Sequence, residues 1–235
     1  MNWNDYIQLG LLTVGLLTLL FYFYKYLRNQ NKSSLDDELK NLTQAFAVKE
    51  LTNPKYKDKT IEYPSNLICT NELCDKCRKQ EKTAFRLNNK LSVYDNFYEY
   101  VKCASLYIPD TEFSHRQMIV LYNKFTNNLV HRDRLDLTFQ ILYTCIDGIV
   151  SSWSTNRYKR KQLSRVQNCL TSKQLIYYFF NQIQYADRQR SVNKYLIMLY
   201  EFDFFHKMFE SDAYREIKNQ IPISVEKLVY KQIKK

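Results

Sequence analysis

The stretch MIVLYNKFTNNL, residues 118–129, decides the fold class, because its apolar side chains recur at the spacing of a helix. They lie three or four positions apart, at Met118, Leu121, Tyr122, Phe125 and Leu129. A strand would instead alternate apolar and polar side chains. Residues 135–149 repeat the pattern, at Leu135, Phe139, Leu142, Ile146 and Ile149. Because only a short turn separates the two segments, we expect an antiparallel helical hairpin.

The same period predicts helices on both sides of this pair. Ser34 resembles the first residue of a capping box, Ser92 can cap a second helix, and Thr171 or Ser172 a third. The segment from 175 to 183 is apolar almost all round and is expected to be the central helix. The helices expected besides these cover residues 35–51, 71–91, 92–107 and 192–209, with a proline-containing linker over 53–66.

Glycine is scarce, which excludes several fold classes. The chain of 235 residues has 3 glycines, two of them at positions 10 and 15, so Gly148 is the last in the sequence. Hairpin turns, β-bulges and phosphate-binding loops all depend on glycine. We therefore expect an all-α protein, either a compact multi-helix bundle or a short irregular helical solenoid, and no dinucleotide-binding fold or β-sandwich.

Residues 7–24, IQLGLLTVGLLTLLFYFY, contain no charged side chain. A run of this length predicts a single transmembrane helix rather than a cleaved signal peptide, because no cleavage site of small residues follows it. Lys25, Arg28 and Lys32 follow the run, whereas Asp5 is the only charged residue before it. The positive-inside rule then places the C-terminal domain on the cytosolic or matrix-like side. The expected organisation is an anchor over 1–28, a juxtamembrane helix and linker over 29–66, and a helical domain over 67–235.

Three cysteines, Cys69, Cys74 and Cys77, fall within nine residues. With Cys103, or His115, as a fourth ligand they could hold a structural zinc ion, since zinc prefers four tetrahedral thiolate or imidazole ligands. If the domain faces an oxidising compartment, disulfides are the better interpretation, and buried thiols are the third.

A basic cluster follows Gly148, at Arg157, Lys159, Arg160, Lys161 and Arg165. Residues 151–200 hold nine lysines and arginines against Asp187 alone, a balance of +8. The cluster is interpreted as a solvated helix face or as a contact for anionic lipid headgroups or an acidic protein. Nucleic acid is disfavoured, because Tyr158 is the one aromatic residue within it and single-strand binding needs several stacking rings.

No catalytic arrangement is evident among the three histidines, which form neither a Ser/His/Asp nor an HExxH pattern. The leading hypothesis is therefore a non-catalytic, membrane-anchored helical protein that docks other proteins, as an accessory subunit, adaptor or tether. The abundance of tyrosine and phenylalanine supports it, because these residues are enriched in interfaces. One alternative is a viral or cell-surface envelope protein with an external, disulfide-bonded helical domain, and another is an enzyme whose site a partner completes.

Overall fold

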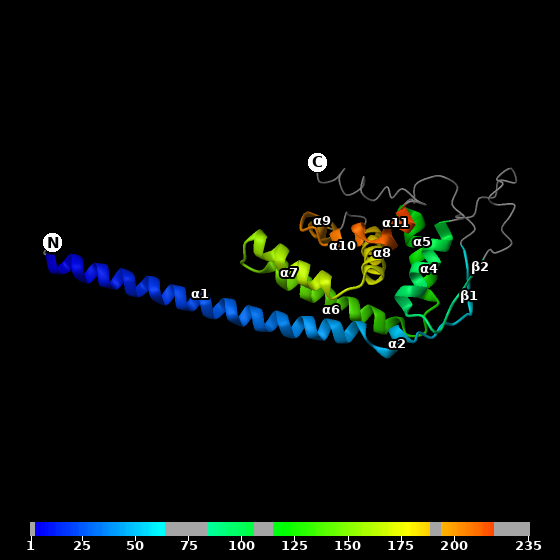
Figure 1. Ribbon diagram of the computed structural model, residues 1–235, viewed down its shortest axis with the longest axis horizontal. Helices are drawn as coiled ribbons and strands as arrows, with labels where there is room; N and C mark the ends of the chain where they lie inside the picture. The colour runs from blue at the N-terminus through cyan, green and yellow to red at the C-terminus, as the bar shows by residue number, and fades with distance from the viewer. Residues whose placement is uncertain (1–2, 64–83, 106–114, 189–193, 219–235) are drawn as a thin grey trace. The chain divides into compact units, whose positions relative to one another are not determined.

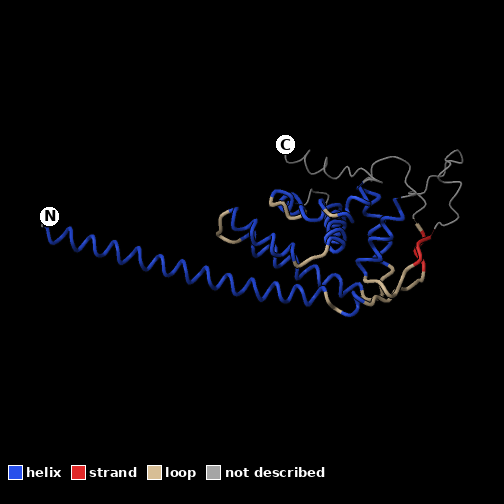
Figure 2. The backbone as a smooth tube through the Cα atoms, viewed as in Figure 1, coloured by secondary structure: helices blue, strands red, loops and turns tan. Residues whose placement is uncertain are grey.

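The computed structural model describes residues 3–63, 84–105, 115–188 and 194–218 (Figure 1). Apart from two short strands these residues form helices and their connections (Figure 2), which confirms the all-α class. The chain divides into two units, Met1–Asn41 and Leu42–Lys235. The elements in chain order are α1 (Trp3–Phe46), α2 (Lys49–Thr52), β1 (Thr60–Glu62), β2 (Ala84–Arg86), α4 (Val93–Ser105), α5 (His115–Asn127), α6 (Arg132–Ser151), α7 (Asn156–Asn168), α8 (Ser172–Arg188), α9 (Lys194–Glu201), α10 (His206–Glu210) and α11 (Asp212–Lys218).

The first unit is helical throughout its described residues, because α1 is continuous from Trp3 to Phe46. The predicted new helix start at Ser34 is therefore wrong. The sequence contains no glycine or proline between Leu16 and Phe46, so nothing in this stretch interrupts the helix. Within the described residues, no helix has both the length and the apolar character needed to cross a membrane.

The second unit is organised around α8, which contacts α4, α5, α9, α10 and α11. All six residues from 175 to 180 are buried, which confirms the prediction of a central helix. Phe97 of α4 illustrates the packing, since its ring centroid lies 4.5 Å from that of Tyr177 and 5.2 Å from those of Phe125 and Phe180. The core therefore consists largely of interlocked aromatic rings.

The predicted hairpin of residues 118–129 with residues 135–149 does not form the main packing contact. These segments are α5 and α6, and α5 packs chiefly on α8 whereas α6 packs on α7. A short connection made the hairpin the simplest expectation, but the all-round apolar surface of α8 needs α5 as a cover. The helical hairpin of this region is instead α6–α7, joined by residues 152–155.

Two segments predicted to be linker and helix contain the strands. β1 pairs antiparallel with β2, with Ile61 opposite Phe85. Residues 53–63 are thus part of the fold rather than a free linker. Residues 84–86 form a strand, so the helix predicted over residues 71–91 is wrong at these positions. Burial explains the difference, because Tyr63 stacks on Tyr100 at 5.1 Å and Phe85 meets the same ring at 5.7 Å. These contacts remove apolar surface of both strands from water.

The predicted caps of α4 and α8 are confirmed. The Ser92 hydroxyl accepts a hydrogen bond from the backbone N–H of Asp95 at 3.1 Å. The Thr171 hydroxyl accepts one from the N–H of Gln174, whose side chain accepts from the N–H of Thr171 in return, a reciprocal capping box.

The helix predicted over residues 192–209 is not continuous. It breaks after α9, where Asp203 has a φ of 58°, and resumes as α10. Aspartate tolerates this left-handed conformation better than most residues.

Several buried tyrosines have pKa values far above that of a free phenol. Burial raises the pKa of Tyr94, Tyr122 and Tyr177, because the interior disfavours the phenolate. The hydroxyl groups of Tyr94 and Tyr100 have no hydrogen-bond partner among the described residues, whereas the Tyr122 hydroxyl accepts from the Asn181 amide at 2.7 Å. The folded state therefore holds these protons more tightly than the unfolded chain does.

We predict that Phe97→Ala lowers the free energy of unfolding by about 3–5 kcal/mol, because it removes a fully buried ring and leaves a cavity. Leu137→Ala is the control, because Leu137 on α6 is 48% exposed and should lose less than about 1 kcal/mol. Denaturant unfolding of the full chain in mild detergent, followed by far-ultraviolet circular dichroism, measures both changes. Equal losses in the two variants would contradict the assigned core.

A second prediction concerns alkaline pH. The buried tyrosines contribute their full stabilisation below the unfolded phenol pKa of about 10. Above that pH the free energy of unfolding falls as pH rises towards the higher pKa values of the folded state, by about 1.4 kcal/mol per pH unit for each such tyrosine. Tyr177→Phe should therefore make the fall less steep by about that amount. Phe180→Leu is the control, because it disturbs the same core but removes no titrating proton, so its slope should equal that of the wild type. Unfolding curves at a series of alkaline pH values give the slopes, and an unchanged slope in Tyr177→Phe would refute the assignment.

Candidate functional site

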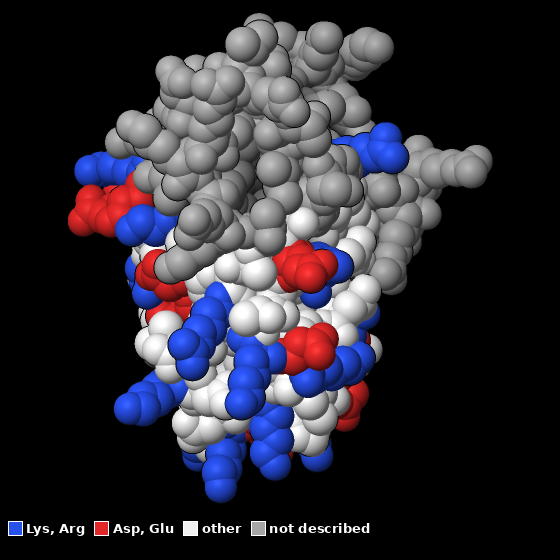
Figure 3. All heavy atoms as spheres, turned by 90° about the vertical axis from the view of Figure 1, so that its right-hand side faces the viewer, with Lys and Arg blue, Asp and Glu red and all other residues white. Residues whose placement is uncertain are grey.

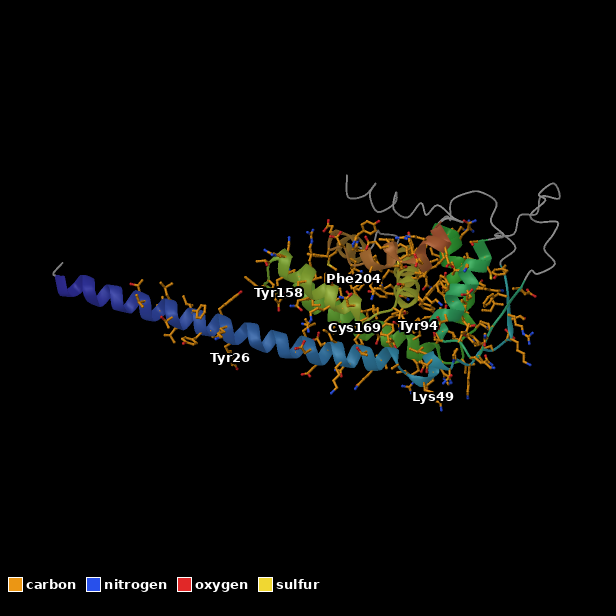
Figure 4. The ribbon with its side chains drawn as sticks, viewed as in Figure 1. Tyr26, Lys49, Tyr94, Tyr158, Cys169 and Phe204 are labelled. Atoms are coloured by element: carbon orange, nitrogen blue, oxygen red, sulfur yellow. The ribbon has the colours of Figure 1, made fainter. Side chains whose placement is uncertain are left out.

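A pocket of about 380 Å³ lies in the second unit where α4 and α8 begin. Ser92 and Asp95 line it from α4 and the residue before it, and Thr171 and Lys173 line it from α8 and its cap. Tyr94, which Figure 4 labels, also lines it. The pocket thus combines hydroxyl groups and the Asp95–Lys173 ion pair with the buried ring of Tyr94.

A line of charged and aromatic side chains extends from this pocket across three helices. The Lys173 ammonium pairs with Asp95 at 2.8 Å and lies 4.8 Å from the centre of the Tyr98 ring. The Tyr98 hydroxyl donates to Glu216 of α11 at 2.6 Å, and Glu216 also pairs with Lys102. The network therefore ties α4, α8 and α11 together at the surface.

The pKa shifts of the carboxyl groups follow from this pairing. Burial alone would raise the pKa of Asp95, but hydrogen bonds from Lys173 and Ser92 outweigh it, and the pKa lies below its ordinary value. Hydrogen bonds from Lys102 and Tyr98 lower the pKa of Glu216. Both groups are therefore held as carboxylates in the folded protein.

The geometry at Ser92 is that of a helix cap and not of an activated nucleophile. Its hydroxyl donates to the Asp95 carboxylate and accepts from the backbone of the same residue. The group that accepts the Ser92 proton in this hydrogen bond is Asp95, and its lowered pKa beside Lys173 makes it a weak general base. The arrangement stabilises the start of α4, and its groups are occupied by one another.

The basic cluster predicted from the sequence lies on α7, and the structure gives its members different roles. The Lys159 ammonium donates to the Val150 carbonyl at 2.6 Å, at the end of α6. Arg160 donates to the Glu201 carbonyl at 3.2 Å, at the end of α9. Both contacts satisfy carbonyl groups at helix C-termini, where positive charge is also favourable.

The other three cations of the cluster are less engaged in the fold. Arg165 donates to the Gln162 side chain at 3.0 Å. Arg157 and Lys161, one helical turn apart, are exposed and have no hydrogen-bond or ion-pair partner among the described residues. They are therefore the two cations of the cluster that can meet an anionic partner without first releasing a contact.

The predicted zinc ligands are only partly within the described residues. Cys69, Cys74 and Cys77 lie outside them, so their arrangement stays a prediction. Cys103 is a half-buried thiol on α4, and burial followed by the nearby Glu99 carboxylate raises its pKa. In the described part of the chain, no group of three or more histidine, cysteine, aspartate or glutamate side chains could hold a metal ion.

Sequence reasoning missed Trp153, in the turn between α6 and α7, which is fully exposed. It also missed the Asp95–Lys173 and Lys102–Glu216 pairs, which join residues far apart in the sequence. A signal for Trp153 is present in hindsight, since its neighbours at 151, 152, 154 and 155 are all serine or threonine. Such a turn offers an indole no apolar cover.

We predict that Lys173→Gln lowers the free energy of unfolding at pH 7 by up to about 1 kcal/mol, because it removes a partly exposed ion pair. Asp95 contributes stability above its unfolded pKa of about 4, and this contribution is lost as pH falls through the lower folded value. The difference from wild type should therefore shrink in acid. Lys124→Gln, an exposed lysine on α5, serves as the control. A deficit that persists undiminished at acidic pH would show that the ion pair is not its cause.

The chain matches no family model, no curated protein and no solved structure in the comparisons made with each. The function proposed below therefore rests on the residues of this chain alone.

Proposed function

We propose that the chain is a non-catalytic, membrane-anchored helical protein that docks other proteins, as an accessory subunit, adaptor or tether. In this proposal residues 7–24 form a single-pass anchor and the second unit is the docking domain. The apolar surface of α1 is the observation that carries the proposal.

The described side chains from residue 16 to residue 26 of α1 are all exposed, on every side of the helix. They include Leu16, Leu19 and Phe21, each more than 60% exposed. Exposing apolar surface to water costs roughly 25 cal/mol per Å², and a soluble monomer rarely leaves so large an apolar surface uncovered. The side chains of residues 7–12 lie outside the described set, and in the sequence they extend this charge-free run to eighteen residues. A run of that length suits the hydrocarbon core of a bilayer.

The proposed orientation follows from the charges beside the run. Lys25, Arg28 and Lys32 follow the run, which favours a cytosolic or matrix-like position for the second unit.

Support for a protein partner comes from α6 and not from the number of aromatic residues. Most described tyrosines and phenylalanines of the second unit are buried in its core, so their abundance is no sign of an interface. Leu137 and Tyr143 of α6 are about half exposed, at 48% and 47%. They give this helix apolar side chains that a protein partner could cover.

We predict that the full chain stays with the membrane pellet after extraction with alkaline carbonate. Leu16→Arg combined with Leu20→Arg should move it to the soluble fraction, since an arginine at the centre of a membrane helix costs roughly 2.5–3.5 kcal/mol. Leu137→Arg is the matched control, because it places the same charge on an exposed leucine of the domain and should leave the chain in the pellet.

The same membranes test the orientation. Protease added outside sealed vesicles with the cytosolic face outward should digest the second unit before the vesicles are opened. Release of the wild-type chain by carbonate would refute the anchor. Retention of the chain with a protected second unit would keep the anchor and reverse the orientation.

A further inference from the structure

Trp153 is presented to solvent by a turn that is held at both ends. On one side the Ser152 hydroxyl donates to the Ile149 carbonyl at 2.7 Å, at the end of α6. On the other side the Thr155 hydroxyl caps α7 by accepting from the backbone N–H of Tyr158, a residue labelled in Figure 4, at 3.3 Å. The indole between these two caps is fully exposed. Tryptophan is on average a highly buried residue, so we expect a partner to cover the Trp153 indole.

The charges beside Trp153 indicate what that partner is. Arg157 and Lys161 lie on the first turns of α7, exposed and without a partner among the described residues. The helix α7 contains no acidic residue. The end of the α6–α7 hairpin therefore combines one large amphipathic ring with two available cations.

A bilayer surface matches this combination better than a protein does. Indole rings favour the boundary between headgroups and acyl chains, and each lysine or arginine near an anionic leaflet gains about 1 kcal/mol. A stable protein interface buries roughly 800 Å² on each partner around a cluster of apolar anchors. The residues next to Trp153 in the sequence are instead serine, threonine and asparagine, which suits a shallow insertion of one ring.

We propose that the end of the α6–α7 hairpin, formed by Trp153, Arg157 and Lys161, is a second and reversible membrane contact that binds an anionic lipid surface. The proposal builds on the proposed function, because the anchor over residues 7–24 keeps a bilayer within reach of the domain. Tethering raises the effective concentration of the lipid surface to the millimolar range, so a weak contact suffices.

The chain contains two tryptophans, so the variant Trp3→Phe makes Trp153 the sole indole reporter. The full chain with this change is reconstituted into vesicles of phosphatidylcholine alone and into vesicles with about 30 mol% phosphatidylserine, which carry a negative surface potential. We expect the Trp153 emission to shift to the blue and to be quenched by brominated lipid only in the anionic vesicles. About 0.5 M salt should reverse both changes, because it screens exposed charges.

Two charge variants in the Trp3→Phe background separate the hairpin from general basicity. Arg157→Gln with Lys161→Gln should lower the ratio of inserted to free Trp153 by roughly 30-fold. Lys57→Gln with Lys59→Gln removes the same charge from exposed lysines next to β1 and should change the ratio less than about 3-fold. Figure 3, which views the molecule from the side of β1 and β2, shows basic side chains interspersed with acidic ones there, so this is a fair control for charge alone.

The outcomes distinguish this inference from the anchor. A chain that floats with both kinds of vesicle while Trp153 stays unshifted overturns the inference and leaves the anchor intact. An equal shift in neutral vesicles, or equal effects of the two charge variants, also overturns it. A chain that binds only the anionic vesicles, with salt-reversible quenching of Trp153, refutes the anchor and supports the hairpin contact.

Discussion

The burial of residues 175–180 on every side of α8 is the constraint on which the second unit depends. A helical stretch that is apolar on every side has no polar face to present to water, so other helices must surround these residues. Phe97 from α4 and Phe125 from α5 both reach Tyr177, and Phe205, next to α10, packs on Phe179. The helices are thus joined through one shared element rather than through neighbouring pairs. This explains why α5 packs on α8 although α6 follows it after a short turn.

For some buried tyrosines of that core, the free energy gained by burying the ring is offset by the cost of burying the hydroxyl. Burying an aromatic ring contributes about 1.5–3 kcal/mol, whereas leaving a hydroxyl without a hydrogen bond costs about 1–3 kcal/mol. Tyr94 and Tyr100 have such hydroxyls among the described residues. For these two residues the cost of the hydroxyl offsets much of the stabilisation that burial of the ring contributes. Asn96, by contrast, is fully buried and donates to the carbonyls of Asn88, Leu91 and Ser92, which fixes the start of α4. Asn96 therefore specifies the start of α4, whereas Tyr94 and Tyr100 chiefly fill volume in the core.

Sequence reasoning succeeded where the determinant is local. The period of residues 118–129 and the caps at Ser92 and Thr171 are properties of a few adjacent residues, and both were confirmed. It failed where distant residues decide. The strands β1 and β2 have three residues each, too few for a period, and their position depends on the burial of Ile61 and on the contact of Phe85 with Tyr100. Ser34 shows the reverse error. It matches a local capping motif, but no glycine or proline interrupts the helix there, so α1 continues through it. For the candidate site the sequence located the basic cluster but could not assign a role to each cation.

That assignment changes what the net charge of +11 implies. Lys159 and Arg160 bind carbonyl groups at the ends of α6 and α9, so part of the charge on α7 belongs to the fold itself. Removing these two side chains would leave carbonyl groups at helix ends without their hydrogen bonds as well as delete charge. A loss of binding in such variants would therefore say little about a partner. Arg157 and Lys161 lack this complication, and beside Trp153 they make a surface too small to bind a bilayer tightly by itself. Such a surface gains most in a chain that is already tethered, because tethering raises the effective concentration of the lipid surface, and the hairpin and the proposed anchor would then act together.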